Sequence, residues 1–175
     1  MPNPYQRYLS LAGIDSSGLS DEELRSLARK ILERKIHGIS FSPYREGQSP
    51  GTILGATQIR ERMSILKPYV KWIRSFSCTD GNELIPGIAA ENGLKTMVGV
   101  WLDGDRDRNE LEVANAIKVA QAGHAGILAG GNEVLLRDVL SAEELLAYIR
   151  RVKEAAPDVP VGYVDAYFKF VDYPQ

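Results

Sequence analysis

The sequence predicts an α/β protein of the (β/α)8 TIM-barrel type. Apolar, strand-like runs recur about every 25 to 35 residues, and a helix-like segment follows each of them, which is typical of βα units in a parallel sheet. A doubly wound nucleotide-binding sheet competes with the barrel, but it calls for a glycine-rich phosphate turn after an early strand. Here the first strand leads into Ser42-Pro43-Tyr44-Arg45 instead. We therefore favour the barrel.

The chain forms one domain in this interpretation. Its 175 residues, 44% of them hydrophobic, are enough for one substantial core and too few for two comfortable domains. Residues 1–35 read as an N-terminal extension and helix, and residues 36–175 carry five strands with their helices.

Periodicity and turn residues place each element in order. Ser20-Asp21-Glu22-Glu23 is a capping box that opens an amphipathic helix. Strands are predicted at 38–41, 71–76, 96–101, 126–129 and 161–164, and further helices at 58–66, from about 82 to 92, from about 109 to 122, and from 142 until Pro157 ends it.

Size separates this chain from a complete barrel. A closed (β/α)8 barrel has eight strands and about 250 residues, so the sequence looks truncated after about five βα units. Open edges and bare apolar faces then predict self-association or a separate carboxyl-terminal half. The side chains expected to face inward are Ile39, Ile73, Val98, Val100, Ile127 and Leu128.

Composition argues against several other classes of protein. Net charge is −2 with no basic stripe, so nucleic acid is not expected as a partner. One cysteine and two separated histidines give no metal cluster, and no metal or cofactor is expected. The N-terminus lacks the apolar core of a signal peptide and no run reaches membrane-spanning length, which predicts a cytoplasmic location for the chain as written.

The most informative stretch is Gly126–Arg137, GILAGGNEVLLR. The pattern predicts a buried strand that opens into a loop at Gly130-Gly131 and places Asn132 and Glu133 at the edge of the sheet where barrels carry their chemistry. Apolar surroundings would favour a Glu133 carboxyl group that keeps its proton. The alternative is a loop or helix-capping glutamate that bonds nearby backbone.

The segments GISFSPYREGQSP, IRSFS, GLKTMVGVWL and GGNEVLLR resemble the amino-terminal part of glycoside hydrolase family 17, the bacterial β-1,3-glucanase and glucan transglycosylase type. The resemblance implies that Glu133 is the general acid/base and that Asn132 contacts the sugar. It also places Phe41 and Tyr44 where the family has an aromatic residue after the first strand. The nucleophilic glutamate that the family carries after its seventh strand has no counterpart here.

This resemblance implies a retaining enzyme that acts on β-glucan oligo- or polysaccharide. Such enzymes pair a protonated acid with a nucleophilic carboxylate about 5–5.5 Å away, so we expect this chain alone to be inactive. The alternative is a non-catalytic partial barrel that binds glucan or a partner protein.

Other candidate residues have two interpretations each. Trp101, Tyr44 and Tyr167 could stack on sugar rings or pack in the core, and Arg74 could order carboxylates in the barrel mouth or form an internal ion pair. The Asp-rich loop at 103–109 lacks the glycine and glutamate of a calcium loop and is read as solvated. His37 and His124 precede strands at the face opposite the expected site, so they are read as structural. Lys71 and Lys95 also lie at strand starts, which argues against a Schiff-base aldolase.

Overall fold

A computed structural model describes residues 16–173, and its core is one parallel sheet of five strands. The strands lie side by side in chain order, β1-β2-β3-β4-β5. Their bounds are Ile36–Ser40 for β1, Val70–Arg74 for β2, Lys95–Gly99 for β3, Ile127–Asn132 for β4 and Val161–Val164 for β5. Parallel strands in sequential order, with helices between them, are the arrangement of part of a (β/α) barrel. The predicted fold class is confirmed.

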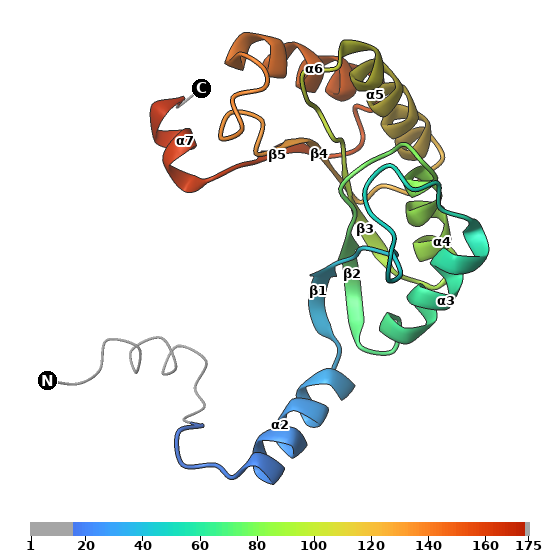
Figure 1. Cartoon of the computed structure of the whole chain (residues 1–175), viewed down its shortest axis with the longest axis vertical. Helices are drawn as coiled ribbons and strands as arrows, with labels where there is room; N and C mark the ends of the chain where they lie inside the picture. The colour runs from blue at the N-terminus through green and yellow to red at the C-terminus, as the bar shows by residue number, and fades with distance from the viewer. Residues whose placement is uncertain (1–15, 174–175) are drawn as a thin grey trace, which may run out of the picture.

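Helices connect successive strands and cover one side of the sheet. Figure 1 shows the strands along the inner side of an arc and α3, α4, α5 and α6 along its outer side. The helices are α2 (Asp21–Glu33), α3 (Ala56–Leu66), α4 (Ile85–Glu91), α5 (Arg106–Gln121), α6 (Ala142–Ala155) and α7 (Tyr167–Asp172), and a short 3-10 helix, η2 (Asn82–Leu84), precedes α4. Five of these helices were predicted, whereas α7 was not.

Capping residues set where the longer helices begin. Ser20 and Ser141 each form a capping box, in which the serine hydroxyl accepts from the backbone N–H three residues on and the glutamate there accepts from the serine backbone. Asp105 caps α5 by accepting from the Arg108 backbone N–H. Because Asp105 is the N-cap, α5 begins at Arg106, three residues before the predicted start at about residue 109.

Two clusters of buried side chains form the core between sheet and helices. One joins Ile73 of β2 to Ile59, Met63 and Ile88 of α3 and α4, and the other joins Val98 and Leu128 to residues of α5 and α6. The prediction that Ile73, Val98, Val100 and Leu128 face the inside of the barrel is therefore wrong, since they pack among helical side chains. Alternation along a strand is the reason, because consecutive residues such as Ile127 and Leu128 cannot share a face.

The inner face of the sheet lies opposite the face that α3, α4, α5 and α6 cover (Figure 1). A shallow hollow on this face has a lining that includes Trp72, Arg74, Met97 and Ile127. Strands β1 and β5 each pair on one side only within residues 16–173. An inner face and two edges thus remain open in the described part of the chain.

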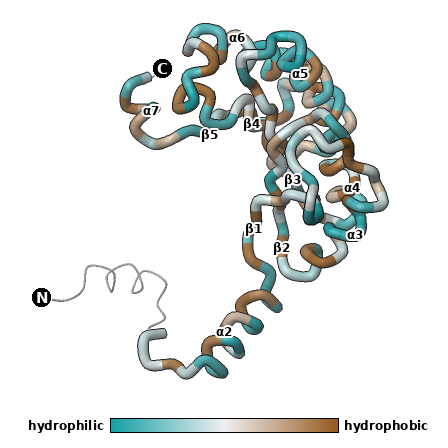
Figure 2. The backbone as a smooth tube through the Cα atoms, in the orientation of Figure 1, coloured by the Kyte–Doolittle hydropathy of each residue, from teal (hydrophilic) through white to brown (hydrophobic). Residues whose placement is uncertain are grey.

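Helix α2 projects from the start of β1 away from the sheet (Figure 1). It is amphipathic and has no buried residue, and Figure 2 shows hydrophobic positions alternating with hydrophilic ones along its length. None of the helices among residues 16–173 is long and apolar enough to cross a membrane.

Candidate functional site

A cavity of about 590 Å³ opens at the carboxyl ends of β1, β2 and β3. Its walls come from the loops that follow these strands, with Arg108 of α5 closing one side. Parallel strands bring loops that are distant in sequence to one edge of the sheet, and active sites of barrels lie there. The position therefore matches the edge at which the sequence predicted the chemistry.

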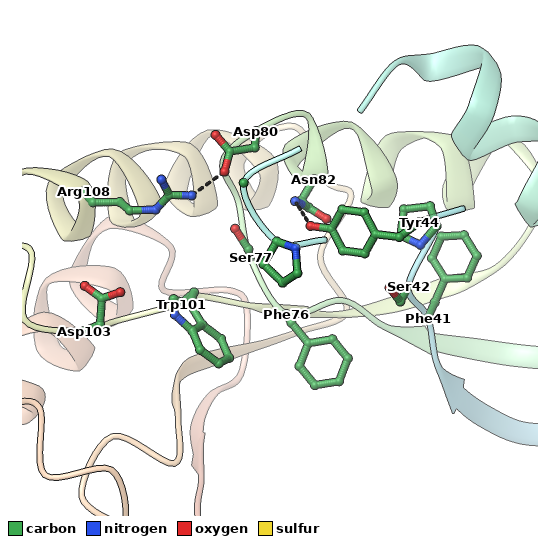
Figure 3. A pocket seen from close by; sticks show the side chains of 13 residues that line it. Phe41, Ser42, Tyr44, Phe76, Ser77, Asp80, Asn82, Trp101, Asp103 and Arg108 are labelled. Carbon is green, nitrogen blue, oxygen red and sulfur yellow. Dashed lines mark hydrogen bonds and ion pairs between the residues drawn. The ribbon is translucent and has the colours of Figure 1, made fainter. Parts of the chain in front are cut away.

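Four aromatic residues line the cavity. Phe41 and Tyr44 follow β1, Phe76 follows β2, and Trp101 follows β3 (Figure 3). Phe41 is buried, whereas the other three rings are partly exposed. Flat aromatic faces beside polar groups are suited to a ligand whose own faces are apolar and whose edge is polar, as in a pyranose ring.

The polar wall of the cavity is held by hydrogen bonds between its own members. Arg108 forms an ion pair with Asp80, and Asn82 Nδ2 donates to the Tyr44 hydroxyl at 3.4 Å; both contacts are drawn in Figure 3. The ion pair raises the pKa of Arg108, so the guanidinium stays charged. These groups can contact a ligand without first having to be ordered.

Asn132 ends β4, the strand next to β3, and Glu133 follows it directly. The pairing of β4 with β5 is irregular between Ala129 and Asn132, which marks a bulge at Gly130-Gly131. A Cβ at Gly130 would lie 2.9 Å from Ile149 Cγ1, and Gly131 has a φ of 129°, so glycine fits both positions. Bulges of this kind redirect the side chains that follow them.

Glu133 has a fixed backbone and an exposed side chain. Its φ is 53°, a left-handed conformation that costs a non-glycine residue about 1–2 kcal/mol. Its N–H donates to Val164 O at 2.8 Å, and its carbonyl accepts from Arg137 N at 2.8 Å. The apolar surroundings expected for the Glu133 carboxyl group are not found, since this residue is exposed. Strained backbone of this kind is often found at functional sites.

Arg74 links β2 to the end of β4 across the inner face. Its Nη2 donates to the Asn132 side-chain oxygen, and its guanidinium lies 4.8 Å from the centroid of the Phe76 ring. The internal ion pair that was one interpretation of Arg74 is not what forms, since its partner is an amide. The contact fixes the Asn132 amide with its oxygen toward Arg74, which leaves the NH2 group to donate elsewhere.

A second arginine joins the β4 loop to the cavity. Arg137 Nη2 donates to the carbonyls of Leu102 and Asn132 at 2.7 and 2.9 Å, and its guanidinium lies 4.5 Å from the centroid of the Trp101 ring. The loop carrying Glu133 is thereby connected to the loop carrying Trp101.

Asp165, at the end of β5, holds the same loop from the other side. Its Oδ2 accepts from Leu135 N at 3.2 Å and Leu136 N at 3.3 Å, and it also accepts from the Tyr163 hydroxyl. Burial, together with that hydrogen bond, raises the pKa of Tyr163, so its hydroxyl keeps the proton that it donates.

Glu112 of α5 is a buried carboxylate that the sequence interpretation missed. It is 0% exposed, and burial raises its pKa while four hydrogen bonds act in the opposite direction. The sequence did contain an indication of this burial. Glu112 is spaced three or four residues from Asn109 and Ala116 and adjoins Val113, and all of these lie on the buried face of α5. A charged residue on an apolar helix face is seldom buried without a partner.

The remaining predicted residues lie elsewhere. Tyr167 begins α7, is 83% exposed and packs edge-on against Phe168, so it does not line the cavity. His37 stacks on Trp72 with ring centroids 6.1 Å apart, and His124 is exposed before β4. In the Asp-rich loop, Asp103 Oδ1 accepts from the Asp105 backbone. Among residues 16–173, no group of three or more histidine, cysteine, aspartate or glutamate side chains could hold a metal ion.

Comparison with known proteins gives one match. A family model described as the BtgE/BtgC glycoside hydrolase domain matches residues 38–175. No curated protein matches the chain, and no solved structure does.

Proposed function

The chain belongs to the BtgE/BtgC glycoside hydrolase domain family, and from this premise we propose that it acts on β-1,3-glucan by retention, as glycoside hydrolase family 17 enzymes do. Glu133 is the general acid/base and Asn132 a sugar contact. The observation that carries the proposal is the position of Asn132 and Glu133 at the carboxyl end of β4, one strand beyond the aromatic cavity.

The proposed reaction has two steps. Glu133 gives its proton to the glycosidic oxygen as the bond to the anomeric carbon breaks, and a nucleophilic carboxylate bonds that carbon. Glu133, now ionised, then takes a proton from water or a sugar hydroxyl, whose oxygen displaces the carboxylate. Hydrolysis and transglycosylation differ only in which of these acceptors arrives.

Each side chain has a role in this scheme. Trp101 and Tyr44 receive sugar faces in the cavity, whose wall also contains the buried Phe41. Arg74 holds the Asn132 amide so that its NH2 group donates to a sugar hydroxyl. The nucleophile is a second glutamate, which the family 17 resemblance places after a seventh strand. The carbohydrate therefore binds across the carboxyl edge of β1 to β4.

A second candidate is glucan binding without cleavage. It is favoured by one feature, namely that the cavity walls come from β1, β2, β3 and α5, without Glu133. A chain that lost its catalysis could keep this cavity unchanged.

Both proposed functions require that the cavity binds β-1,3-glucan. Calorimetric titration with laminari-oligosaccharides, which are β-1,3-linked, tests this binding. Trp101→Ala removes the ring on the cavity wall and should lower affinity about tenfold, equivalent to about 1.4 kcal/mol. Trp72→Phe is the matched control, because Trp72 lies on the inner face beside His37 and not in the cavity. Equal affinities for β-1,3- and β-1,4-linked oligosaccharides would reject the proposed linkage.

Cleavage separates the two candidates. In a polypeptide that also supplies the second carboxylate, products that first appear with the anomeric configuration of the substrate would identify retention, whereas inverted products would reject the mechanism. Binding without any cleavage by such a polypeptide would favour the second candidate.

A further inference from the structure

Glu112 accepts four hydrogen bonds in the core. Its Oε1 accepts from the hydroxyls of Ser77 and Thr79, the latter at 2.7 Å. Its Oε2 accepts from the backbone N–H groups of Cys78 at 2.7 Å and Trp101 at 3.0 Å. A carboxylate has about four acceptor positions, and all are occupied here.

The four donors belong to two segments that line the cavity. Ser77, Cys78 and Thr79 follow β2, and Trp101 follows β3. Ser77 and Trp101 are themselves cavity residues, whereas Thr79 and Glu112 are not. One buried side chain therefore ties together two walls of the cavity.

Neighbouring residues of α5 extend the same attachment. Arg108, one turn before Glu112, donates to the Thr79 hydroxyl at 3.1 Å and pairs with Asp80. Asn109 binds both the N–H and the carbonyl of Asp103, at 2.9 and 2.8 Å. Asn115 Nδ2 donates to Cys78 O at 2.8 Å. This face of α5 therefore holds the loops after β2 and β3 through hydrogen bonds, in addition to its apolar packing.

We propose that Glu112 is a positioning residue for carbohydrate binding, which holds the Ser77–Thr79 segment and Trp101 in the geometry that a sugar ring requires. The proposal rests on the proposed function, because it takes the cavity to be the carbohydrate site. It assigns to Glu112 no contact with substrate. Burying a carboxylate is unfavourable unless hydrogen bonds compensate for it, and these four bonds all serve the cavity walls.

Two substitutions at Glu112 separate the role of its acceptors from that of its volume. Glu112→Gln keeps one oxygen for the two backbone N–H groups, and its NH2 group can donate to the Ser77 and Thr79 hydroxyls, which rotate to accept. Glu112→Met has a similar volume and no comparable acceptor. The matched control is Glu110→Met on the same helix, where the glutamate is exposed and pairs with Arg151 at 2.7 Å.

Amide hydrogen exchange measures the positioning without any ligand. In Glu112→Met, the amides of Cys78 and Trp101 should exchange roughly tenfold faster or more, because each loses a buried hydrogen bond. Glu112→Gln and Glu110→Met should keep both amides protected. Unchanged exchange at Cys78 and Trp101 in Glu112→Met would overturn the proposal.

Affinity for laminari-oligosaccharide measures the consequence. It should fall about tenfold in Glu112→Met and be largely restored in Glu112→Gln. Affinity in Glu112→Met equal to that in Glu110→Met would overturn the proposal. Absence of binding by the unmodified chain would refute the proposed function, and the exchange rates would still show whether Glu112 holds the two segments.

Thr79 provides a second test if Glu112→Met does not fold. Thr79→Val removes one hydroxyl that Glu112 binds and keeps the side-chain shape, whereas Thr79→Ser keeps the hydroxyl. Because Thr79 does not line the cavity, lower affinity in Thr79→Val alone would support positioning. Equal affinities in the two variants would count against it.

Discussion

Gly99 ends β3 beneath the cavity, and replacing it with alanine should displace the loop that follows β2. A Cβ at Gly99 would lie 2.5 Å from Ser75 O, 2.7 Å from Phe76 Cα and 2.9 Å from Phe76 C. All three atoms belong to backbone, so no side-chain rotation can relieve the contact. Phe76, whose ring lines the cavity, must move with the strand end.

The expected loss of stability follows from this overlap. Overpacking a well-packed site costs about 1–3 kcal/mol and occasionally more, and the contact with three backbone atoms favours the upper end. For a chain of this size, about 3 kcal/mol corresponds to a fall in Tm of about 6–12 °C. The affinity for laminari-oligosaccharide should fall as well, because the ring of Phe76 shifts.

Thermal unfolding followed by circular dichroism measures this effect against a matched glycine. At Gly104 an added Cβ meets no atom within 4 Å, so Gly104→Ala should change stability by no more than about 0.5 kcal/mol. If Gly99→Ala and Gly104→Ala unfolded at the same temperature, the close approach of β3 to the Ser75-Phe76 backbone would not exist as described.

Three further outcomes are expected. Asn132→Ala should lower kcat and kcat/KM together in a polypeptide with both carboxylates, because the amide binds the sugar more strongly in the transition state; a change confined to KM would mark a uniform contact. Ser141→Ala should destabilise the chain by about 0.5–2 kcal/mol in urea unfolding, since it removes the cap of α6, and an unchanged midpoint would contradict that cap. The 175-residue chain should self-associate in size-exclusion chromatography with light scattering, because β1 and β5 have open edges in the part of the chain that the structure describes; a stable monomer at high concentration would argue against pairing through them.

Sequence patterns predicted the strands well because each is a short apolar run bounded by turn residues. The predicted β5 has the observed bounds, Val161–Val164, whereas β4 continues to Asn132, three residues past its prediction. The glycines Gly130 and Gly131 suggested a loop, but they form a bulge that keeps pairing with β5. Local composition cannot distinguish these outcomes, because the bulge depends on the neighbouring strand.

The candidate site was predicted less completely than the fold. Trp101, Tyr44 and Phe41 follow strands and do line the cavity, because the carboxyl ends of parallel strands share one edge. Tyr167 follows β5 in the same way but begins a short exposed helix. Glu112 and Asn82 were missed because they act from a helix face and a helix start, and their partners become close only through the fold.

Cleavage rates of Glu133→Gln on two kinds of substrate test the central claim most directly. In a polypeptide that supplies both carboxylates, the rate on unactivated laminarin-type glucan should fall by roughly 10²–10⁴, because the amide cannot give a proton to the leaving oxygen. The rate on an aryl β-glucoside with a good leaving group should fall much less, since that oxygen departs without a proton. Rates for Glu133→Gln equal to those of the unmodified protein on both substrates would remove Glu133 from the mechanism.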